Sequence, residues 1–380
     1  MIYNLKKFIV LIIILASVKA QALPVSYDLR AESRISQINN NISGDSWAFA
    51  VIGACESNFM TQFPDSSINL SQKNLILNAR EFNDEFTTTA ILSRMPELYN
   101  FRLKDVYFMS RFWPFDPDFI STETRKNLIM NHGAIYAGIY LDTEKFDRRG
   151  KFITYFNNSH ERNININALI IGWDDNLPLH YFTPRPSNNG AWLIKSENNY
   201  FWTPYEQNIR GGAAFILEKF NPDMRIYLHD ELGYCSSIKF SWAANIFRVR
   251  EDLEYFSEAA FYTPLNNMSW DLYFYECGNI YPDSPISGLM KAHISGKFEL
   301  AGYHTVKFPE KISLWQGEYF AIVLKLGRKI MPVETVITNY SDNAIINAKE
   351  SYFSEDGQKW LDGENFNSNA CIKAFTVIKE

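Results

Sequence analysis

The sequence has no excess of basic residues. Its 380 residues include 37 Lys and Arg against 43 Asp and Glu, which gives a formal net charge of -6. A surface that binds nucleic acid needs clustered Lys and Arg to neutralise phosphates, and an acidic balance argues against one. We therefore expect no nucleic-acid partner.

The chain also has no apolar run long enough to predict a membrane-spanning helix. The candidate, residues 8–16, follows two lysines and is far shorter than the ~20 residues that a bilayer requires. Small residues follow at Ala20 and Ala22, a pattern typical of a secretory signal peptide with its cleavage site. We expect a signal peptide over residues 1–22 and export to a periplasm, the cell surface or the extracellular space. No stable membrane insertion is expected.

Cysteine and histidine are scarce, with four and six residues. None of the spacings among Cys55, Cys235, Cys277 and Cys371 resembles a metal site. Four cysteines allow three disulfide pairings, and the sequence does not choose between them. Buried free thiols are the simpler interpretation, above all for Cys55, which lies inside a predicted helix. We expect no metal ion and no cofactor.

Hydrophobic residues, by contrast, are plentiful at 46% of the chain. Single hydrophobic cores stop growing at roughly 250–300 residues, so a chain of this length predicts two domains. We place them at residues 23–222 and 223–380. No long linker separates them, and we expect them to pack together.

The first half of the chain mixes helical and strand patterns. Apolar residues recur near helical spacing after Ser46, and the preceding residues suit a helix N-terminus. Short apolar runs between turn residues predict buried strands. The predicted helices cover residues 46–63, begin at residue 71 and cover residues 122–131, where Gly133 follows; the predicted strands cover residues 134–140, 167–173 and 190–195.

From about Met224 onward, strand patterns dominate. Residues 270–275 alternate between apolar and more polar side chains, which is the period of a half-buried strand. Further strands are predicted at residues 319–324 and 369–377, with turn residues between the strands. Their spacing favours a β-sandwich of roughly 150 residues.

One short segment carries the strongest functional signal. Residues 44–50 read Gly-Asp-Ser-Trp-Ala-Phe-Ala and resemble the nucleophile segment of the papain-like cysteine peptidases, with serine where the family has cysteine. Other segments resemble the same family in its order: residues 23–30, 54–57, 70–72, 168–175 and 190–195. Residues 227–233, 354–357 and 371–376 resemble the lectin-like domain that follows the peptidase in a bacterial branch of the family.

The resemblance implies an α+β fold. A two-lobed papain-like domain, with a helical lobe and a β-rich lobe, is expected to be followed by an all-β sandwich lectin-like domain. It also assigns the catalytic positions. The nucleophile falls on Ser46, the general base on Asn167, the residue that orients the base on Ser196 and the oxyanion donor on Asn40. The family has Cys, His, Asn and Gln there, so all four side chains are substituted.

These substitutions remove the expected chemistry. A serine hydroxyl at a helix N-terminus stays protonated and needs a general base before it can attack. Asn167 cannot be that base, because an amide does not accept and return a proton at ordinary pH. Ser196 has no imidazole to orient, and Asn40 is one methylene shorter than glutamine. Losing nucleophile and base together resembles losing the whole catalytic unit.

Other residues offer only weak replacements for the base. His160 lies seven residues before Asn167, about 23 Å along an extended strand, and would need a rearranged loop. Glu197 follows Ser196 directly and could deprotonate a serine, but a solvated loop glutamate is the simpler interpretation. The remaining histidines are expected at surface, helix-end or second-domain positions.

Three hypotheses follow. The first is an exported homologue of the papain-family cysteine peptidases that is catalytically inactive and keeps a binding role, with an extended peptide or a glycan as partner. The alternative is a residual hydrolase that uses Ser46 as nucleophile with an unidentified base. The third is an adhesin in which the first domain is only a spacer.

Overall fold

The computed structural model describes residues 22–36, 46–64, 68, 70–77, 85–94, 96, 100–109, 120–159, 163–197 and 199–378. The predicted signal peptide, except Ala22, lies outside the described residues. Asn40 and His160 lie outside them as well.

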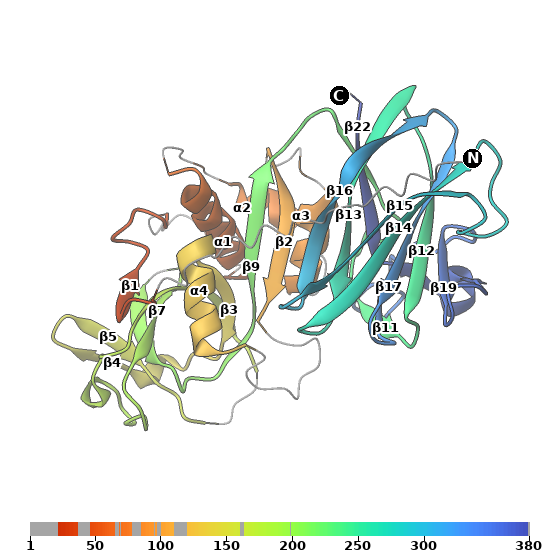
Figure 1. Ribbon diagram of the computed structural model, residues 1–380. Helices are drawn as coiled ribbons and strands as arrows, with labels where there is room; N and C mark the ends of the chain where they lie inside the picture. The colour runs from red at the N-terminus through yellow and green to blue at the C-terminus, as the bar shows by residue number, and fades with distance from the viewer. Residues whose placement is uncertain are drawn as a thin grey trace, which may run out of the picture.

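All α-helices in the described part of the chain belong to its first half (Figure 1). They are α1 (Ser46–Gln62), α2 (Gln72–Leu77), α3 (Glu85–Arg94) and α4 (Thr122–His132), and short 3-10 helices are η2 (Thr143–Lys145), η3 (Leu179–Tyr181) and η4 (Gly363–Phe366). Helices α1 and α4 and the start of α2 confirm the predictions. Helix α3 is not among the predicted elements.

One sheet of thirteen strands runs through both halves of the described chain, in the order β10-β22-β13-β16-β2-β9-β3-β6-β7-β8-β5-β4, with β1 paired to β6. The first half supplies β1 (Ser26–Asp28), β2 (Phe101–Phe108), β3 (Ile135–Ile139), β4 (Phe146–Arg149), β5 (Phe152–Tyr155), β6 (Ile166–Asp174), β7 (Ala191–Lys195), β8 (Tyr200–Pro204) and β9 (Ile209–Lys219). The second half supplies β10 (Met224–Tyr227), β13 (Leu253–Thr263), β16 (Gly302–Trp315) and β22 (Ile372–Val377). Strands β3, β6 and β7 confirm the three predicted buried strands.

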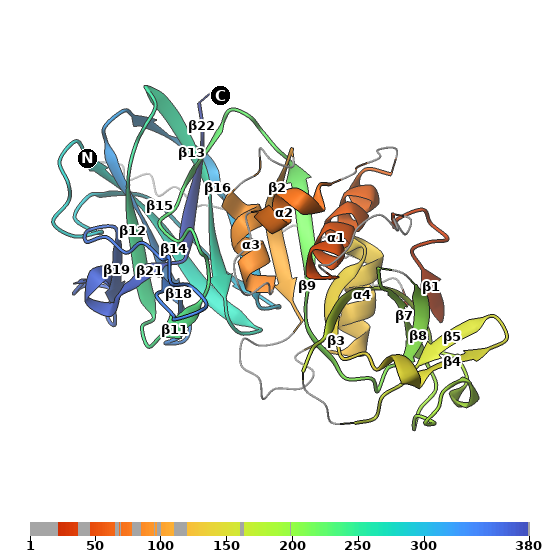
Figure 2. The ribbon, with the colours of Figure 1, turned by 180° about the vertical axis from the view of Figure 1, so that it is seen from behind.

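A second sheet of six strands, in the order β15-β14-β17-β12-β19-β20, packs on the second-half strands of the first. Its strands are β12 (Trp242–Arg248), β14 (Met268–Gly278), β15 (Leu289–Phe298), β17 (Tyr319–Leu326), β19 (Ser351–Ser354) and β20 (Leu361–Asp362). A three-stranded sheet joins β11 (Ser236–Ile238), β18 (Met331–Thr335) and β21 (Ser368–Ala370). Figures 1 and 2 show this sandwich at one end of the molecule and β4, β5, β7 and β8 at the other, with the helices between them.

Aromatic rings fill the space between the two sheets of the sandwich. The ring centroids of Phe256 on β13 and Phe274 on β14 lie 4.5 Å apart, and those of Phe274 and Phe320 on β17 lie 5.5 Å apart. Along β14 the buried residues alternate with half-buried or exposed ones, as the period-2 pattern predicts. The second half is therefore the predicted β-sandwich.

The predicted C-terminal strand over residues 369–377 is divided in the structure. Strand β21 ends at Ala370 and β22 begins at Ile372, so the chain passes from one sheet to another at Cys371. The Cys371 N–H donates to Pro332 O at 3.3 Å. A continuous apolar run cannot reveal such a change of sheet, because both strands are buried.

Helix α1 lies at the centre of the first half. It packs against β6, β9 and α4, and its residues 47–58 are all buried. The buried Asn58 side chain donates to His132 O at 2.8 Å and accepts from the Leu217 N–H at 2.8 Å. Buried polar groups need such partners, so these bonds fix the position of α1 against α4 and the sheet.

Helix α4 has a clear beginning and end. At its start, Ser121 Oγ accepts from the Thr124 N–H at 3.1 Å, an N-terminal cap. It ends at Gly133, whose φ of 91° favours glycine. A Cβ at this position would also come within 2.7 Å of Ser57 Oγ on α1. The predicted stop at Gly133 is confirmed, and the contact with α1 makes it sterically necessary.

The two halves share a sheet through β2 and β16. Gly302 pairs with Tyr107, and Tyr303 pairs with Val106. The backbones approach so closely that a Cβ on Gly302 would lie 1.8 Å from Val106 O. Strand β2 was not predicted from the sequence, although it supplies this junction.

A buried arginine reinforces the junction. The Arg102 side chain on β2 is 2% exposed, and its guanidinium contacts the carboxylates of Glu218 on β9 and Glu258 on β13. Its Cζ lies 4.6 Å from the ring centroid of Phe375 on β22. The halves therefore pack together, as expected, while the domain boundary near residue 222 stays a prediction within the turn between β9 and β10.

Candidate functional site

The structure brings Ser46 and Asn167 together. Ser46 is the first residue of α1, and Asn167 is the second residue of β6. The backbone N–H of Asn167 donates to Ser46 Oγ at 3.0 Å. Positions 121 residues apart in sequence thus meet where a helix N-terminus abuts a strand, as the resemblance implies. The hydroxyl accepts from the backbone at this position, and no imidazole or carboxylate is bonded to it in the described part of the chain.

The Asn167 side chain is held by a tyrosine. Its Oδ1 accepts from the Tyr136 hydroxyl at 3.0 Å, across the paired strands β3 and β6. Tyr136 is buried, and its hydroxyl occupies the place beside the expected base position. Sequence reasoning did not identify Tyr136, because its position in the apolar β3 predicts only a core residue.

Ser196 belongs to a tight turn after β7. Its Oγ donates to Asn199 O at 3.2 Å and accepts from the Asn199 N–H at 3.3 Å. The Ser196 N–H also donates to Asn199 O at 2.9 Å. Every hydrogen bond that the described structure gives Ser196 stays within this turn, so no hydrogen bond links it to Asn167 or Ser46. Ser196 therefore belongs to the connection between β7 and β8.

The other expected site residues contribute little to the described site. Asn40 and His160 lie outside the described residues, and Glu197 lies half-buried in the loop after Ser196. The His132 ring, at the end of α4, lies 5.7 Å from the Tyr107 ring, and burial lowers the pKa of His132. His180 lies exposed in η3. None of the described histidines belongs to α1, β3, β6 or β7.

The strand and helix that flank the site, β7 and α1, also carry two buried charged residues, Lys195 and Glu56. Lys195, the last residue of β7, donates from Nζ to Ser36 O at 2.7 Å and lies 5.2 Å from the Phe49 ring centroid. Burial lowers the pKa of Lys195 to about 8. Glu56 on α1 accepts from the Leu70 N–H at 2.9 Å, and burial raises its pKa. These residues lie in the family-like motifs of the sequence, and their contacts anchor the first-half loops to α1.

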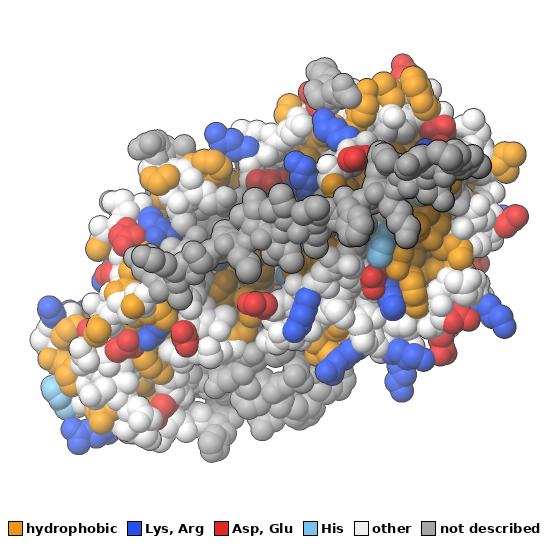
Figure 3. Space-filling model, viewed as in Figure 1, with side chains coloured by type: hydrophobic (Ala, Val, Ile, Leu, Met, Phe, Trp, Pro, Cys, Tyr) orange, Lys and Arg blue, Asp and Glu red, His pale blue; other side chains and the backbone are white. Residues whose placement is uncertain are grey.

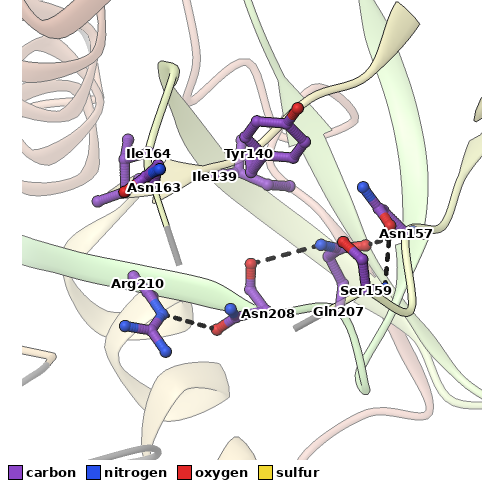
Figure 4. A pocket seen from close by; sticks show the side chains of 10 residues that line it. Ile139, Tyr140, Asn157, Ser159, Asn163, Ile164, Gln207, Asn208 and Arg210 are labelled. Atoms are coloured by element: carbon purple, nitrogen blue, oxygen red, sulfur yellow. Dashed lines mark hydrogen bonds between the residues drawn. The ribbon is translucent and has the colours of Figure 1, made fainter. Parts of the chain in front are cut away.

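A small polar cavity lies beside the end of β3 and the start of β9 (Figure 4). It encloses about 10 Å³, which is about the space of one water molecule. Gly138, the β3 partner of Asn167, lines it, as does Arg210 of β9, whose Nε donates to Asn208 Oδ1 at 3.2 Å. The amides of Gln207 and Asn157 supply further polar lining. The cavity is too small for a peptide side chain.

The four cysteines form no disulfide with one another. Cys55, Cys235 and Cys371 are buried, and burial raises the pKa of the Cys55 and Cys371 thiols. A raised pKa keeps the thiol protonated and unreactive, since the thiolate is the nucleophile. The Cys55 and Cys371 thiols are therefore unsuited to nucleophilic attack.

The comparisons with known proteins agree with this geometry. Residues 226–376 match the family model described as a lectin like domain. The chain has the fold of a papain-like cysteine protease followed by a lectin-like domain, the class that the sequence motifs predicted. A search of curated proteins finds no match.

Two solved structures of Cwp84 share the whole arrangement. A clostridial cysteine protease Cwp84 variant after propeptide cleavage has a TM-score of 0.77 and 22% identity, covering 93% of this chain and 99% of its own. The cysteine protease and lectin-like domains of Cwp84 from Clostridium difficile, a surface layer associated protein, have a TM-score of 0.74 and 21% identity, covering 94% and 89%. At such identities the likeness concerns the fold.

Proposed function

We propose that this chain is an exported, catalytically inactive homologue of the papain-like cysteine peptidases that keeps a binding role for a peptide or glycan. The observation that carries the proposal is the bond from the Asn167 N–H to Ser46 Oγ. The hydroxyl is engaged as an acceptor from the backbone, and the side chain at the base position is an amide held by Tyr136. Neither group can remove the serine proton.

The physical argument concerns the nucleophile and the base together. A cysteine thiol at a helix N-terminus ionises near neutral pH, whereas a serine hydroxyl depends on a base. In a peptidase with a catalytic triad, loss of nucleophile or base lowers kcat by about 10⁶-fold, and further losses add little. Ser46, Asn167 and Ser196 are therefore expected to leave no measurable turnover.

Export rests on the predicted signal peptide over residues 1–22. No helix within the described residues is long and apolar enough to cross a membrane. Cwp84 is described as a surface layer associated protein, which is consistent with a similar location for this chain. We propose a periplasmic, cell-surface or extracellular location and leave the choice to fractionation of the native host.

A fluorogenic peptide panel tests the proposed inactivity. We expect residues 23–380 and the matched Ser46→Ala variant to hydrolyse every substrate at the same rate as buffer alone. Turnover by the unsubstituted protein that disappears in Ser46→Ala would instead establish the alternative, a hydrolase with Ser46 as nucleophile. Turnover that persists in Ser46→Ala would point to a contaminating enzyme, which repeated purification removes.

A further inference from the structure

A groove of about 700 Å³ lies on the lectin-like half, away from the papain-like site. Its walls come from β10 and the turn after it, the end of β12, the start of β17 and residues 348–350 before β19. Arg94, at the end of α3, contributes from the first half. Within the described sheets β10 pairs only with β22, so one edge of β10 has no partner strand at this groove.

The groove carries an excess of positive charge. Its charged lining comprises four cations, Arg94, Arg248, Arg250 and Lys349, and two carboxylates, Glu231 and Glu350. Both carboxylates have partners. Glu231 Oε2 lies 3.4 Å from Arg94 Nη1, and Glu350 Oε2 lies 3.4 Å from His229 Nδ1. Burial lowers the pKa of His229, which favours a neutral ring.

Three of the cations are left without an acidic partner. Arg248, Arg250 and Lys349 are exposed and have no carboxylate within ion-pair distance in the described part of the chain. The whole chain has a net charge of -6. On the face drawn in Figure 3, acidic and basic side chains are interspersed. A local cluster of cations without acidic partners attracts anions to this groove, although the protein as a whole is acidic.

The protein holds the two arginines in position. The Arg250 Cζ lies 4.2 Å from the Tyr227 ring centroid, and its Nη2 donates to Ile226 O at 2.6 Å, on β10. The Arg248 Cζ lies 5.6 Å from the Tyr319 ring centroid. A guanidinium has five N–H donors, so these contacts leave several available to a ligand. Such preorganisation reduces the entropy that binding costs.

Two tyrosines and Lys349 form another part of the lining, and Tyr319 joins it to Arg248. The rings of Tyr281 and Tyr319 meet edge to face, with centroids 5.4 Å apart. The Tyr281 hydroxyl donates to Lys349 O and lies 2.7 Å from the Tyr352 hydroxyl. Lys349 has a φ of 67°, which L residues rarely adopt. Its backbone is thus held by Tyr281 in a conformation that the surrounding structure imposes.

We propose that this groove binds an anionic saccharide, with Arg248, Arg250 and Lys349 on its acidic groups and Tyr281 and Tyr319 against its sugar rings. Arginine presents paired donors that match the planar oxygens of a carboxylate or the oxygens of a sulfate or phosphate. Tyrosine offers an apolar ring with a polar tip, which suits the C–H faces and hydroxyls of a sugar. The inference deepens the proposed binding role and rests on it.

A saccharide fits better than an acidic peptide. The lectin-like match over residues 226–376 includes every lining residue except Arg94. Each tyrosine ring lies beside a cation: Arg248 Cζ is 5.6 Å from the Tyr319 ring centroid, and Lys349 Nζ is 5.6 Å from that of Tyr281. Rings and charges that alternate in this way suit a ligand of repeating sugar rings that each carry a charge. A peptide would instead use the unpaired edge of β10, but Arg250 already donates to Ile226 O on that strand.

Affinity electrophoresis and calorimetry on residues 23–380 test the proposal with three polymers. Polygalacturonate carries carboxylates, dextran sulfate carries sulfates, and neutral dextran carries neither. We expect binding to at least one anionic polymer and none to neutral dextran. Arg248→Gln and Arg250→Gln should each weaken binding about tenfold, because each removes charge-assisted hydrogen bonds, and the double variant about a hundredfold.

Lys329→Gln is the matched control. Lys329 follows β17 at the end remote from Tyr319, and its Nζ pairs with Glu355 at 2.7 Å. Its loss should leave affinity unchanged, and thermal unfolding should verify that every variant stays folded. Three results would overturn the proposal. The first is a loss of affinity in Lys329→Gln equal to that in Arg248→Gln and Arg250→Gln. The others are equal binding to neutral dextran and no binding to either anionic polymer.

A fourth polymer separates ligand classes. Poly-glutamate that binds as tightly as the anionic saccharides, and through the same arginines, would overturn the saccharide in favour of an acidic protein. Peptide turnover is a separate readout. Turnover would overturn the proposed inactivity and leave the groove intact, whereas failed saccharide binding would leave the inactivity intact.

Discussion

The papain-like site and the groove of the lectin-like half use their polar side chains in opposite ways. At the papain-like site, the polar atoms of Ser46, Asn167 and Ser196 bond to the backbone or to a neighbouring side chain. In the groove, Arg248 and Arg250 are exposed, and only part of their donors is used within the protein. Polar groups already satisfied by the protein serve the fold, whereas unsatisfied groups on a rigid wall are available to a ligand.

The difference lies in what each polar group contacts. At Ser46, the N-terminus of α1 meets β6, and the hydroxyl of Ser46 bonds to the backbone of that strand. Each substituted residue now has a local role: Ser46 accepts from β6, Asn167 bonds to Tyr136, and Ser196 closes a turn. These bonds give all three residues a role in the fold, whatever their role in a reaction.

Among these predictions, a substitution at the junction between the two halves should lower the free energy of unfolding most. Arg102→Met removes a buried guanidinium and leaves the carboxylates of Glu218 and Glu258 without it. Removing one partner of a buried ion pair destabilises by about 3–5 kcal/mol. Urea unfolding followed by circular dichroism should show this loss. Lys104→Met, an exposed position on the same strand, is the control, and an equal loss there would contradict the role of Arg102.

Acid should weaken the junction through His304. This residue of β16 is buried, its Nε2 lies 3.0 Å from Thr263 Oγ1, and burial lowers its pKa to about 3. Below its ordinary pKa of 6.5, the unfolded chain binds a proton that the folded chain does not, so stability falls as pH falls. The slope reaches at most about 1.4 kcal/mol per pH unit.

Urea titrations at pH 7, 6 and 5 measure this dependence. The stability advantage of the unsubstituted protein over His304→Gln should narrow as the pH falls. Asp105, 3.9 Å from His304 Nδ1, acts in the opposite direction, because burial raises its pKa to about 6 and favours the folded state in acid. A difference that stays constant across the series would show that His304 does not titrate as its burial requires.

The smallest expected loss of stability is that of Ser46→Ala, which tests whether the Ser46 hydroxyl stabilises the fold. Ser46→Ala leaves the Asn167 N–H without its acceptor, which should cost about 1 kcal/mol. A matched Ser313→Ala change, at an exposed position of β16, should cost no measurable stability. Equal stabilities of the two variants would contradict the structural role of the Ser46 hydroxyl and would sharpen the case for a functional one.

Local patterns predicted much of the fold. Apolar spacing, capping residues and a glycine stop predicted helices α1 and α4. Short apolar runs between turn residues predicted the buried strands β3 and β7. Helix α3 and β2 were not predicted. Strand β2 mixes charged and apolar residues, and a charged residue such as Arg102 is ordinarily exposed. Only its partners Glu218 and Glu258, which lie 116 and 156 residues away, explain its burial.

The sequence likewise predicted only part of the candidate site. The motifs placed Ser46 and Asn167 at one site, and the structure brings them within hydrogen-bond distance. The motifs did not reveal Tyr136 as a partner or the turn that takes up Ser196. The groove was invisible to sequence reasoning, because its lining is drawn from residues scattered between Arg94 and Glu350.

The sequence by itself determined that this chain combines papain-like motifs with a β-rich lectin-like half, and that no nucleophile–base pair remains in those motifs. These conclusions depend on residue identity and local order, which the sequence states directly. Only the tertiary structure decided that a single sheet joins the halves through β2 and β16, and that Arg248, Arg250 and Lys349 share one groove. Those facts depend on which distant strands pair, and pairing is set by packing across the whole molecule.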